Sequence, residues 1–291
     1  MDLVILAAGM GSRYGGLKQV DPMGPAGETV LDYAVFDARR AGFQRVVFVI
    51  RRDFEVIFRE QVGARCARIL DVDYAFQELT DLPPWGASPR SVGAERQKPW
   101  GTGHAVWCAR RQVADPFAVI NADDFYGEDS FRQLAGFLRK AGPAHRYAMV
   151  GFRLDQTLSE HGAVSRGVAV VRGGKLAGLD ERTGIQPADV GTGAYRGDEI
   201  VSMNCWGFTP AIFAQLEAKF ADFLRTRGTD PKAEFYLPAA ISALVAGGEA
   251  EVEVLPTQAR WFGVTYREDR PRVVAAIDGL IRSGAYPPAL H

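Results

Sequence analysis

A glycine-rich stretch with two cations follows the first apolar segment of the chain. It reads LAAGMGSRYGGLKQ, residues 6–19, and it contains Arg13 and Lys18. Gly9 and Gly11 allow the backbone to turn sharply and to approach a ligand closely. Guanidinium and ammonium groups are good partners for phosphate oxygens. The stretch therefore predicts a phosphate-binding turn, and an ordinary turn with solvated charges is the alternative.

The two commonest phosphate-binding motifs do not fit this stretch. The dinucleotide fingerprint needs Gly or Ala three residues after Gly11, where the chain has Tyr14. A P-loop needs Gly-Lys-Ser/Thr, whereas residues 16–18 read Gly-Leu-Lys. Arg51 and Arg52 follow the second predicted strand, where a dinucleotide site has an acidic residue. The remaining phosphate-binding interpretation of residues 6–19 is a turn whose two cations bind a triphosphate.

Two further segments carry residues suited to the same chemistry. Gly101 and Gly103 flank Thr102 just before an apolar segment, and such glycines admit a flat base or ribose against the backbone. Asp123 and Asp124 end the apolar segment FAVINA, where carboxylates are well placed to hold Mg²⁺. Adjacent strand residues face opposite ways, so we expect one of the two carboxylates to meet the metal. A common turn and a helix cap are the respective alternatives.

Together these segments resemble a known family. LAAGMGSRYGGLKQ resembles the L-A-A-G-x-G-(S/T)-R-x(n)-K signature of the nucleotidyltransferases that make nucleoside-diphosphate sugars. Residues 100–105, WGTGHA, resemble the base-contacting loop of that family. Residues 121–123, Asn-Ala-Asp, lie where the family has a small residue and a metal-binding Asp. Order and spacing agree over most of the chain.

The resemblance implies the roles of individual residues. It assigns catalysis to Arg13, Lys18 and Asp123, with Asp123 also as the Mg²⁺ ligand. It places three residues at the acceptor: Glu181 in the stretch GLDE, Asn204 in MN and Glu234 in EFYL. The residues implied to bind the nucleotide are Leu6, Ala7, Ala8, Gly9, Gly11, Ser12, Gly101 and Thr102.

The resemblance also implies a reaction. A sugar 1-phosphate attacks the α-phosphorus of an NTP in the presence of Mg²⁺, giving a nucleoside-diphosphate sugar and pyrophosphate. The acceptor phosphate is already an anionic nucleophile, so the protein needs mainly to align it and to neutralise charge. A catalytically silent module that senses a nucleotide sugar, and a cytidylyltransferase acting on a non-sugar phosphate, remain as alternatives.

A second metal ligand is less clear. Many family members supply an Asp or Asn late in the chain, where this sequence reads WFGVTY over residues 261–266. One alignment puts Gly263 at the ligand position and another puts Thr265 there. We favour Thr265 acting through water, because Mg²⁺ gives up its hydration reluctantly. Two other options are that Asp269 is the second ligand, or that Asp123 holds Mg²⁺ with substrate phosphates alone.

Alternating strand and helix signals predict an α/β fold with right-handed crossovers. We expect a single domain over 1–291, with a Rossmann-like αβα sandwich and a mostly parallel central sheet. The resemblance implies a GT-A-like nucleotidyltransferase fold. Residues 1–150 would bind nucleotide and metal, and residues 151–291 would bind the acceptor and add a hairpin and helices. The expected strands are 3–7, 46–50, 72–76, 117–120, 168–171, 176–179 and 252–255, and the expected helices are 29–41, 53–62 (capped by Asp53), 130–140, 210–224, 235–246 and 269–282.

Composition limits the classes of partner. The formal net charge of the 291 residues is −1, which does not suggest nucleic acid. The three cysteines are far apart and have no metal-ligand spacing, which favours a reducing compartment. No apolar run approaches the length of a membrane span. We therefore expect a cytoplasmic protein with small-molecule partners, and a homo-oligomer is compatible with these features.

Overall fold

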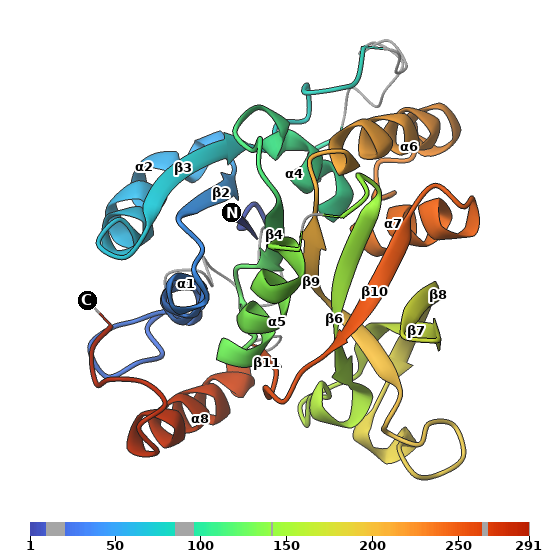
Figure 1. Cartoon of the computed structure of the whole chain (residues 1–291). Helices are drawn as coiled ribbons and strands as arrows, with labels where there is room; N and C mark the ends of the chain where they lie inside the picture. The colour runs from blue at the N-terminus through green and yellow to red at the C-terminus, as the bar shows by residue number, and fades with distance from the viewer. Residues whose placement is uncertain (10–20, 85–95, 141, 264–266, 291) are drawn as a thin grey trace.

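Nine strands form one mixed sheet within the part of the chain that the structure describes. The computed structural model describes residues 1–9, 21–84, 96–140, 142–263 and 267–290. The strands of this sheet are β1 (Asp2–Leu6), β2 (Arg45–Ile50), β3 (Asp71–Phe76), β4 (Phe117–Asn121), β6 (Arg146–Arg153), β7 (Val164–Arg172), β8 (Lys175–Ile185), β9 (Ile200–Phe208) and β10 (Glu251–Pro256). Their order across the molecule is β3-β2-β1-β4-β9-β6-β10-β8-β7 (Figure 1).

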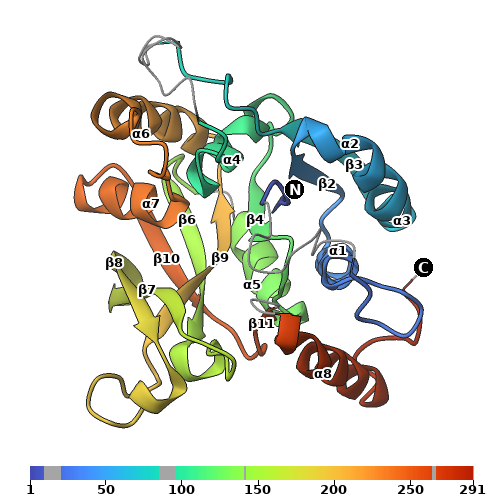
Figure 2. The ribbon, with the colours of Figure 1, turned by 180° about the vertical axis from the view of Figure 1, so that it is seen from behind.

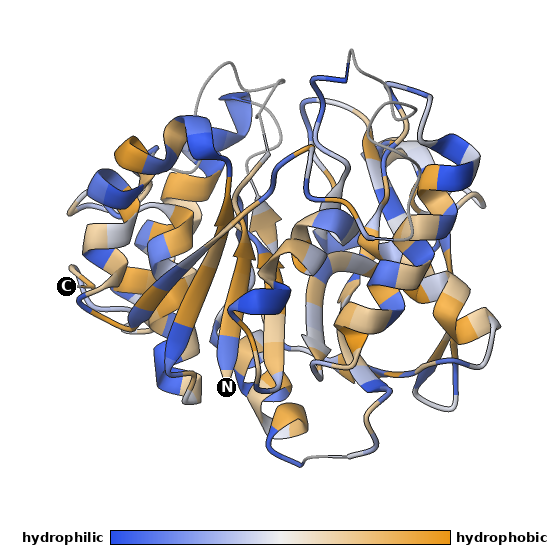
Figure 3. Cartoon of the chain, turned by 90° about the horizontal axis from the view of Figure 1, so that it is seen from above, coloured by the Kyte–Doolittle hydropathy of each residue, from blue (hydrophilic) through white to orange (hydrophobic). Residues whose placement is uncertain are grey.

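Strands β3, β2, β1 and β4 form an all-parallel half of the sheet. Leu3 of β1 pairs with Val46 of β2 on one side and with Ala118 of β4 on the other. Strands β1, β2 and β4 are buried over almost their whole length, and strands covered on both faces need such unbroken apolar runs. These strands are predominantly hydrophobic in Figure 3. The sequence prediction of the four parallel strands is confirmed.

Strands β9, β6, β10, β8 and β7 form a small closed barrel. Strand β9 runs antiparallel to both β4 and β6, β6 runs parallel to β10, and β8 runs antiparallel to β10. Strand β7 pairs with β8 and also with β9, where Gly167 lies opposite Ser202 and Val168 opposite Val201. This last pairing closes the ring.

The barrel corrects the expected mostly parallel sheet with a hairpin beside it. Five of the nine pairings between described strands of this sheet are antiparallel. The hairpin itself is confirmed, with Gly173 and Gly174 at positive φ in its turn. Its register shifts between Val164 and Arg166 and again between Val170 and Val171, and such irregularities bend a strand. The bend brings Gly167 and Val168 in the middle of β7 to β9, a pairing that no local sequence pattern could indicate.

Helices cover both faces of the parallel half. One apolar core joins Leu3 and Ile5 of β1 to α1 and α5, and the other joins Val4 to α4, α6 and α7. The described helices are α1 (Val30–Ala41), α2 (Glu55–Phe58), α3 (Ala64–Cys66), α4 (Thr102–Cys108), α5 (Glu128–Leu138), α6 (Ile212–Arg227), α7 (Leu237–Ala246) and α8 (Arg270–Arg282). No helix in the described ranges has the length and apolar character that a membrane crossing requires.

The boundaries of α1 follow from its end residues. The backbone N–H of Thr29 donates to the Asp32 carboxylate at 2.7 Å, and the Thr29 hydroxyl donates to the same oxygen at 2.8 Å. Gly42 ends the helix with φ at +91°, a conformation that favours glycine. The segment that follows α8 lies beside α1 (Figure 2). Arg40 donates to the Ala285 carbonyl there at 3.1 Å.

The predicted helix capped by Asp53 is wrong in its details. A 3₁₀ turn over Arg52–Phe54 precedes α2, and Asp53 accepts a hydrogen bond from Arg51 Nε at 3.0 Å instead of capping. The helical run continues through a π turn to Cys66. Its buried face carries Phe58, Val62 and Cys66, whereas Ile57 is 38% exposed. Strands β6 and β9 were not predicted.

Candidate active site

A continuous hollow lies at the carboxyl ends of β1 and β4. Its first part, of about 330 Å³, is lined by Leu6, Ala8 and Gly9 and is called here the strand-end chamber. Its second part, of about 550 Å³, is lined by β7, β8 and β9 residues and is called the barrel chamber. Both chambers share six lining residues: Lys98, Thr102, Asn121, Asp123, Asn204 and Glu234.

The structure brings most of the described site predictions to this hollow. Among the residues predicted to bind nucleotide, Leu6, Ala8, Gly9 and Gly101 line the strand-end chamber and Thr102 lines both. Ala7 is fully buried and donates its N–H to Val49, so it supports the turn. Gly11, Ser12, Arg13, Lys18 and Thr265 lie outside the described residues, and their roles stay predictions.

The Gly101-Thr102-Gly103 turn is fixed by the segment after α6. Gly101 has φ at +112°, and a Cβ there would lie 2.6 Å from the Phe235 carbonyl oxygen. Gly103 donates its N–H to that oxygen at 2.9 Å, and the Thr102 hydroxyl accepts the Leu237 N–H at 3.0 Å. The glycines therefore permit close packing against residues 235–237, a role that the sequence analysis did not anticipate.

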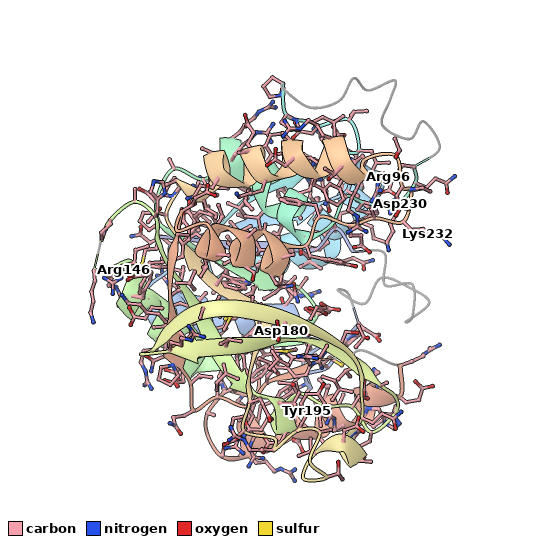
Figure 4. All side chains as sticks on the ribbon, turned by 90° about the vertical axis from the view of Figure 1, so that its right-hand side faces the viewer. Arg96, Arg146, Asp180, Tyr195, Asp230 and Lys232 are labelled. Carbon is pink, nitrogen blue, oxygen red and sulfur yellow. The ribbon has the colours of Figure 1, made fainter. Side chains whose placement is uncertain are left out.

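The buried Arg96 helps to fix the position of the same turn. Its guanidinium lies 3.8 Å from the centre of the Trp100 ring. It donates to the carbonyl oxygens of Lys98 at 2.7 Å and of Ala233 at 2.6 Å. It also donates to the Asp230 carbonyl at 3.1 Å, and both residues lie beside α6 in Figure 4. Through four backbone acceptors Arg96 thus joins residues 98–99 to residues 230–233, which lie between α6 and α7.

The two adjacent aspartates have different environments. Asp124 is buried and its Oδ2 accepts hydrogen bonds from Asn121 Nδ2 at 2.9 Å and from the Tyr126 hydroxyl at 3.2 Å. Burial, followed by the neighbouring Asp123 charge, raises the pKa of Asp124 to about 7. Asp123 is half-buried and lines both chambers.

The physical basis for separating the two aspartates differs from the expected strand alternation. Strand β4 ends at Asn121, and Asp124 begins a separate short strand, β5 (Asp124–Phe125). The two aspartates therefore do not alternate along one strand. Asp124 accepts hydrogen bonds from Asn121 and Tyr126. Asp123 lies at the junction of the two chambers.

The late segment that was considered for a second metal ligand runs beside Asp124. Strand β11 (Phe262–Gly263) pairs antiparallel with β5, and Gly263 lies opposite Asp124. A Cβ at position 263 would lie 2.4 Å from Asp124 Oδ1, so a carboxylate cannot replace this glycine without displacement. Asp269 is buried, accepts a hydrogen bond from the Ser159 hydroxyl at 3.1 Å and does not line either chamber.

The three predicted acceptor residues reach the hollow from separate elements. Glu181 comes from β8 and lines the barrel chamber, where reduced solvation raises the pKa of its carboxyl group. Asn204 comes from β9 with φ at +55°, and its Oδ1 accepts the Trp206 indole N–H at 3.3 Å. A positive φ in a non-glycine residue is strained, and such strain is frequent at functional sites. Glu234 lies before α7 and forms an ion pair with Lys98.

Comparisons with known proteins show two partial sequence similarities. The family of MobA-like NTP transferase domains matches residues 3–84. The UTP–glucose-1-phosphate uridylyltransferase of Bacillus subtilis (strain 168) is 31% identical over 127 residues. That match covers 42% of this chain and 43% of the relative, so it spans less than half the length of the curated relative.

A solved structure extends the likeness to the whole fold. The crystal structure of a UDP-glucose pyrophosphorylase complexed with UDP-glucose superposes with a TM-score of 0.58 and 18% identity. The similarity covers 96% of this chain and 98% of the solved one. The chain therefore shares its overall fold with this pyrophosphorylase. Its α/β architecture is accordingly the nucleotidyltransferase fold, with the parallel half and the barrel as its two parts.

The donor atoms of this candidate site suit a hard cation. Asp123 offers a carboxylate, and Mg²⁺ prefers oxygen ligands while it keeps several waters. The amide oxygens of Asn121 and Asn204 already accept hydrogen bonds, from Asn204 and Trp206 respectively. Across the described ranges, no three His, Cys, Asp or Glu side chains group into a metal site. The residues therefore fit Mg²⁺ held by one carboxylate with water and substrate phosphates.

Two cations of the hollow were missed as site residues. Lys98 lines both chambers and pairs with Glu234, and its place just before the Gly-Thr-Gly turn was a usable signal. Arg166 of β7 lines the barrel chamber, and burial lowers the pKa of its guanidinium to about 10. Nothing in the local sequence distinguishes Arg166 from a solvated strand residue.

Proposed function

We propose that the chain is a magnesium-dependent nucleotidyltransferase that joins an NTP to a sugar 1-phosphate and releases pyrophosphate. In this proposal the parallel half acts as a Rossmann-like nucleotide-binding layer and the barrel half receives the acceptor. The observation that carries it is the junction of the two chambers at Asp123, at the carboxyl ends of β1 and β4. Open α/β sheets bind nucleotides at this edge.

Each group then has a task that its chemistry suits. Arg13 holds the leaving β- and γ-phosphates, and Lys18 holds the α-phosphate or the acceptor phosphate. Asp123 holds Mg²⁺, which when bound neutralises phosphate charge. Glu181, Asn204 and Glu234 accept or donate hydrogen bonds at the sugar hydroxyls. The protein needs no covalent intermediate, because the acceptor phosphate is itself the nucleophile and alignment supplies much of the rate.

The likeness to uridylyltransferases makes UTP and glucose 1-phosphate the first pair to test. Pyrophosphate release is measured with UTP, CTP, GTP, ATP and dTTP against glucose 1-phosphate, other sugar 1-phosphates and phosphocholine. We expect release with at least one NTP and a sugar 1-phosphate, and loss of release on adding EDTA. Release with phosphocholine alone supports the non-sugar cytidylyltransferase, and nucleotide-sugar binding without release supports the silent sensing module.

The phosphate-binding turn and the metal offer two sharper tests. We expect Arg13→Ala and Lys18→Ala each to reduce turnover strongly while the thermal unfolding midpoint stays unchanged. Near-normal turnover in either variant contradicts the assigned roles. Calorimetry is expected to show weak Mg²⁺ binding to the free protein that tightens when NTP is present, because Asp123 supplies only one carboxylate. Tight Mg²⁺ binding without nucleotide contradicts this ligand set.

A further inference from the structure

Strands β4 and β9 separate where the two chambers meet. Within the described residues, their antiparallel pairing ends at Val119 and Trp206. The same register, continued by two residues, would place Asn121 opposite Asn204. Asn204 instead has φ at +55°, and its side-chain Nδ2 donates to Asn121 Oδ1 at 3.4 Å. The two backbones therefore part here, and both asparagine side chains line the two chambers.

The Tyr126 hydroxyl occupies the gap between the two backbones. It accepts the Asn121 backbone N–H at 3.1 Å and donates to the Met203 carbonyl oxygen at 2.8 Å. The same O–H also lies 3.2 Å from Asp124 Oδ2, which shares its proton. A hydroxyl group has one donor and two acceptor sites, so it can join an N–H group of one strand to a carbonyl group of the other. One side-chain O–H therefore takes the place of a direct backbone bond between β4 and β9.

Tyr126 itself does not reach a ligand. Its side chain is 1% exposed and lines neither chamber, and its ring centre lies 6.1 Å from that of Phe152 in the apolar core. Ser130 Oγ donates to the Tyr126 carbonyl at 2.8 Å. Burial raises the pKa of the Tyr126 hydroxyl well above its ordinary value, so the hydroxyl keeps its proton. Tyr126 can therefore act on a reaction only through the groups that it holds.

Those groups belong to different halves of the sheet. Asn121 ends β4 of the parallel half and precedes Asp123 by two residues, whereas Met203 and Asn204 belong to β9 of the barrel. In the proposed reaction the parallel half binds the nucleotide and the barrel binds the acceptor. The reacting atoms must meet in a narrow geometry, and a displacement of about 1 Å can lower the rate about 100-fold.

We infer that Tyr126 is a positioning residue whose hydroxyl fixes the spacing of β4 and β9 and thereby aligns the acceptor with the bound nucleotide. This inference rests on the proposed function. Loss of the hydroxyl leaves the wall residues of each chamber in place, so each substrate should still bind. The step that needs both substrates in the correct relative position should slow, because that interaction matters in the transition state.

Tyr126→Phe tests this role, because it removes one oxygen and keeps the ring. Calorimetry measures the affinity for UTP, and that for glucose 1-phosphate with Mg²⁺ and a non-cleavable α,β-methylene UTP analogue present. Pyrophosphate release with the protein in excess over UTP measures the single-turnover rate. Another NTP and sugar 1-phosphate replace this pair if the original chain prefers them. We expect both affinities to stay within about threefold and the single-turnover rate to fall about 10- to 100-fold.

Tyr147→Phe is the matched control. Tyr147 of β6 is as deeply buried as Tyr126, and its hydroxyl bonds to Gln215 of α6, with neither residue lining a chamber. We expect this variant to lower the thermal unfolding midpoint by a similar amount and to leave the single-turnover rate within about twofold of the original.

Ser130→Ala is a milder variant at the same place. It removes the hydrogen bond to the Tyr126 carbonyl and leaves the Tyr126 hydroxyl present. The single-turnover rate is expected to fall about 2- to 5-fold, as the loss of one neutral hydrogen bond implies. This variant decides the matter if Tyr126→Phe does not fold.

Hydrogen–deuterium exchange tests the contact between the strands without any substrate. The Asn121 N–H loses its acceptor in Tyr126→Phe, so it is expected to exchange at least about tenfold faster than in the original chain. In Tyr147→Phe it is expected to exchange at the original rate.

Three results would overturn the inference. One is an unchanged single-turnover rate in whichever of Tyr126→Phe and Ser130→Ala fold. Another is a loss of affinity for one substrate that equals the loss of rate, which would confine the role to one chamber. The third is an equal loss of rate in Tyr147→Phe, which would make the effect one of general stability.

Failure of the proposed function has a different signature. If the original chain releases no pyrophosphate from any NTP, the proposed function is contradicted, and exchange of the Asn121 N–H then decides whether the Tyr126 hydroxyl holds β4 and β9 together. An exchange rate that Tyr126→Phe does not change would overturn the inference in that case as well.

Discussion

In the parallel half of the sheet, β1 is buried along nearly its whole length, whereas β7 of the barrel has only Val164 and Gly167 buried. The difference reflects position, because β1 lies between two layers of helices while β7 has one face toward the barrel chamber. The parallel half therefore provides a rigid edge that holds Asp123, and the barrel provides polar side chains such as Arg166 and Glu181. Specificity for the acceptor is expected to vary through the barrel.

The largest effect should come from the residue at the junction of the two halves. Asp123→Asn is expected to lower Mg²⁺-dependent turnover about 100- to 1,000-fold, the usual cost of losing a charged group at a reacting phosphate. Asp124→Asn is expected to lower it less than about tenfold, because the Asn121 and Tyr126 contacts hold a side chain of the same shape. Steady-state rates at several Mg²⁺ concentrations measure both. The reverse ranking would exchange the roles of the two aspartates.

A core substitution tests whether the barrel depends on its own packing. Leu176 of β8 is 3% exposed and belongs to the core shared with α4, α6 and α7. Leu176→Ala is expected to lower the free energy of unfolding by about 2–5 kcal/mol. Chemical denaturation measures the change. A loss below 1 kcal/mol would mean that the hairpin contributes little to the folded core.

Two glycine substitutions compare a packing turn with a ligand-facing one. Gly101→Ala is expected to lower the free energy of unfolding by about 1–3 kcal/mol, because of its positive φ and the Phe235 backbone. A Cβ at Gly9 meets no atom of the described residues within 4 Å, so Gly9→Ala should leave the free energy of unfolding within about 0.5 kcal/mol. It is expected to weaken NTP binding instead. Equal stability losses would remove the distinction between the turns.

The contact between α1 and the C-terminal segment should respond to pH. Tyr286 donates to Asp37 Oδ2 at 2.5 Å, and burial raises the pKa of Asp37 to about 7. The unfolded chain loses this proton near pH 3.9, so unfolding releases a proton between about pH 4 and 7. The free energy of unfolding from this group therefore falls as pH rises through that range. Asp37→Asn is expected to flatten the fall.

Denaturation at pH 5 and pH 7.5 measures this effect. Asp278→Asn on α8 is the matched control, since the exposed Asp278 forms a surface ion pair with Arg282. An unchanged pH dependence in Asp37→Asn would show that Asp37 ionises normally in the folded chain.

The smallest effect is expected at the exposed end of the barrel. Lys175 lies next to Leu176 and pairs with Glu251 at 2.5 Å, with both side chains about half exposed. Surface ion pairs contribute about 0–1 kcal/mol, so Lys175→Ala should change the free energy of unfolding by less than 1 kcal/mol. Turnover should not change. A larger loss, measured by the same denaturation assay, would show that the β8–β10 pairing depends on this ion pair.

The sequence by itself determined the parallel half and the place of its chemistry. Unbroken apolar runs identified β1, β2 and β4, because strands covered on both faces leave no polar alternation. Thr29 and Gly42 marked the ends of α1, since capping is a local property. The position of Asp123 followed from the end of the β4 run. The described residues implied by the family resemblance then gathered at one hollow, apart from Ala7 behind it.

Only the tertiary structure decided the rest. Strand β9 lies between β4 and β6, and β7 returns to it, through pairings between residues far apart in the sequence. Local patterns carry no information about such partners. The same distance hid the reason for Gly101, which is the Phe235 backbone, and the position of Arg166 in the wall of the barrel chamber. A residue's type shows what chemistry it can do, and long-range packing decides which groups it meets.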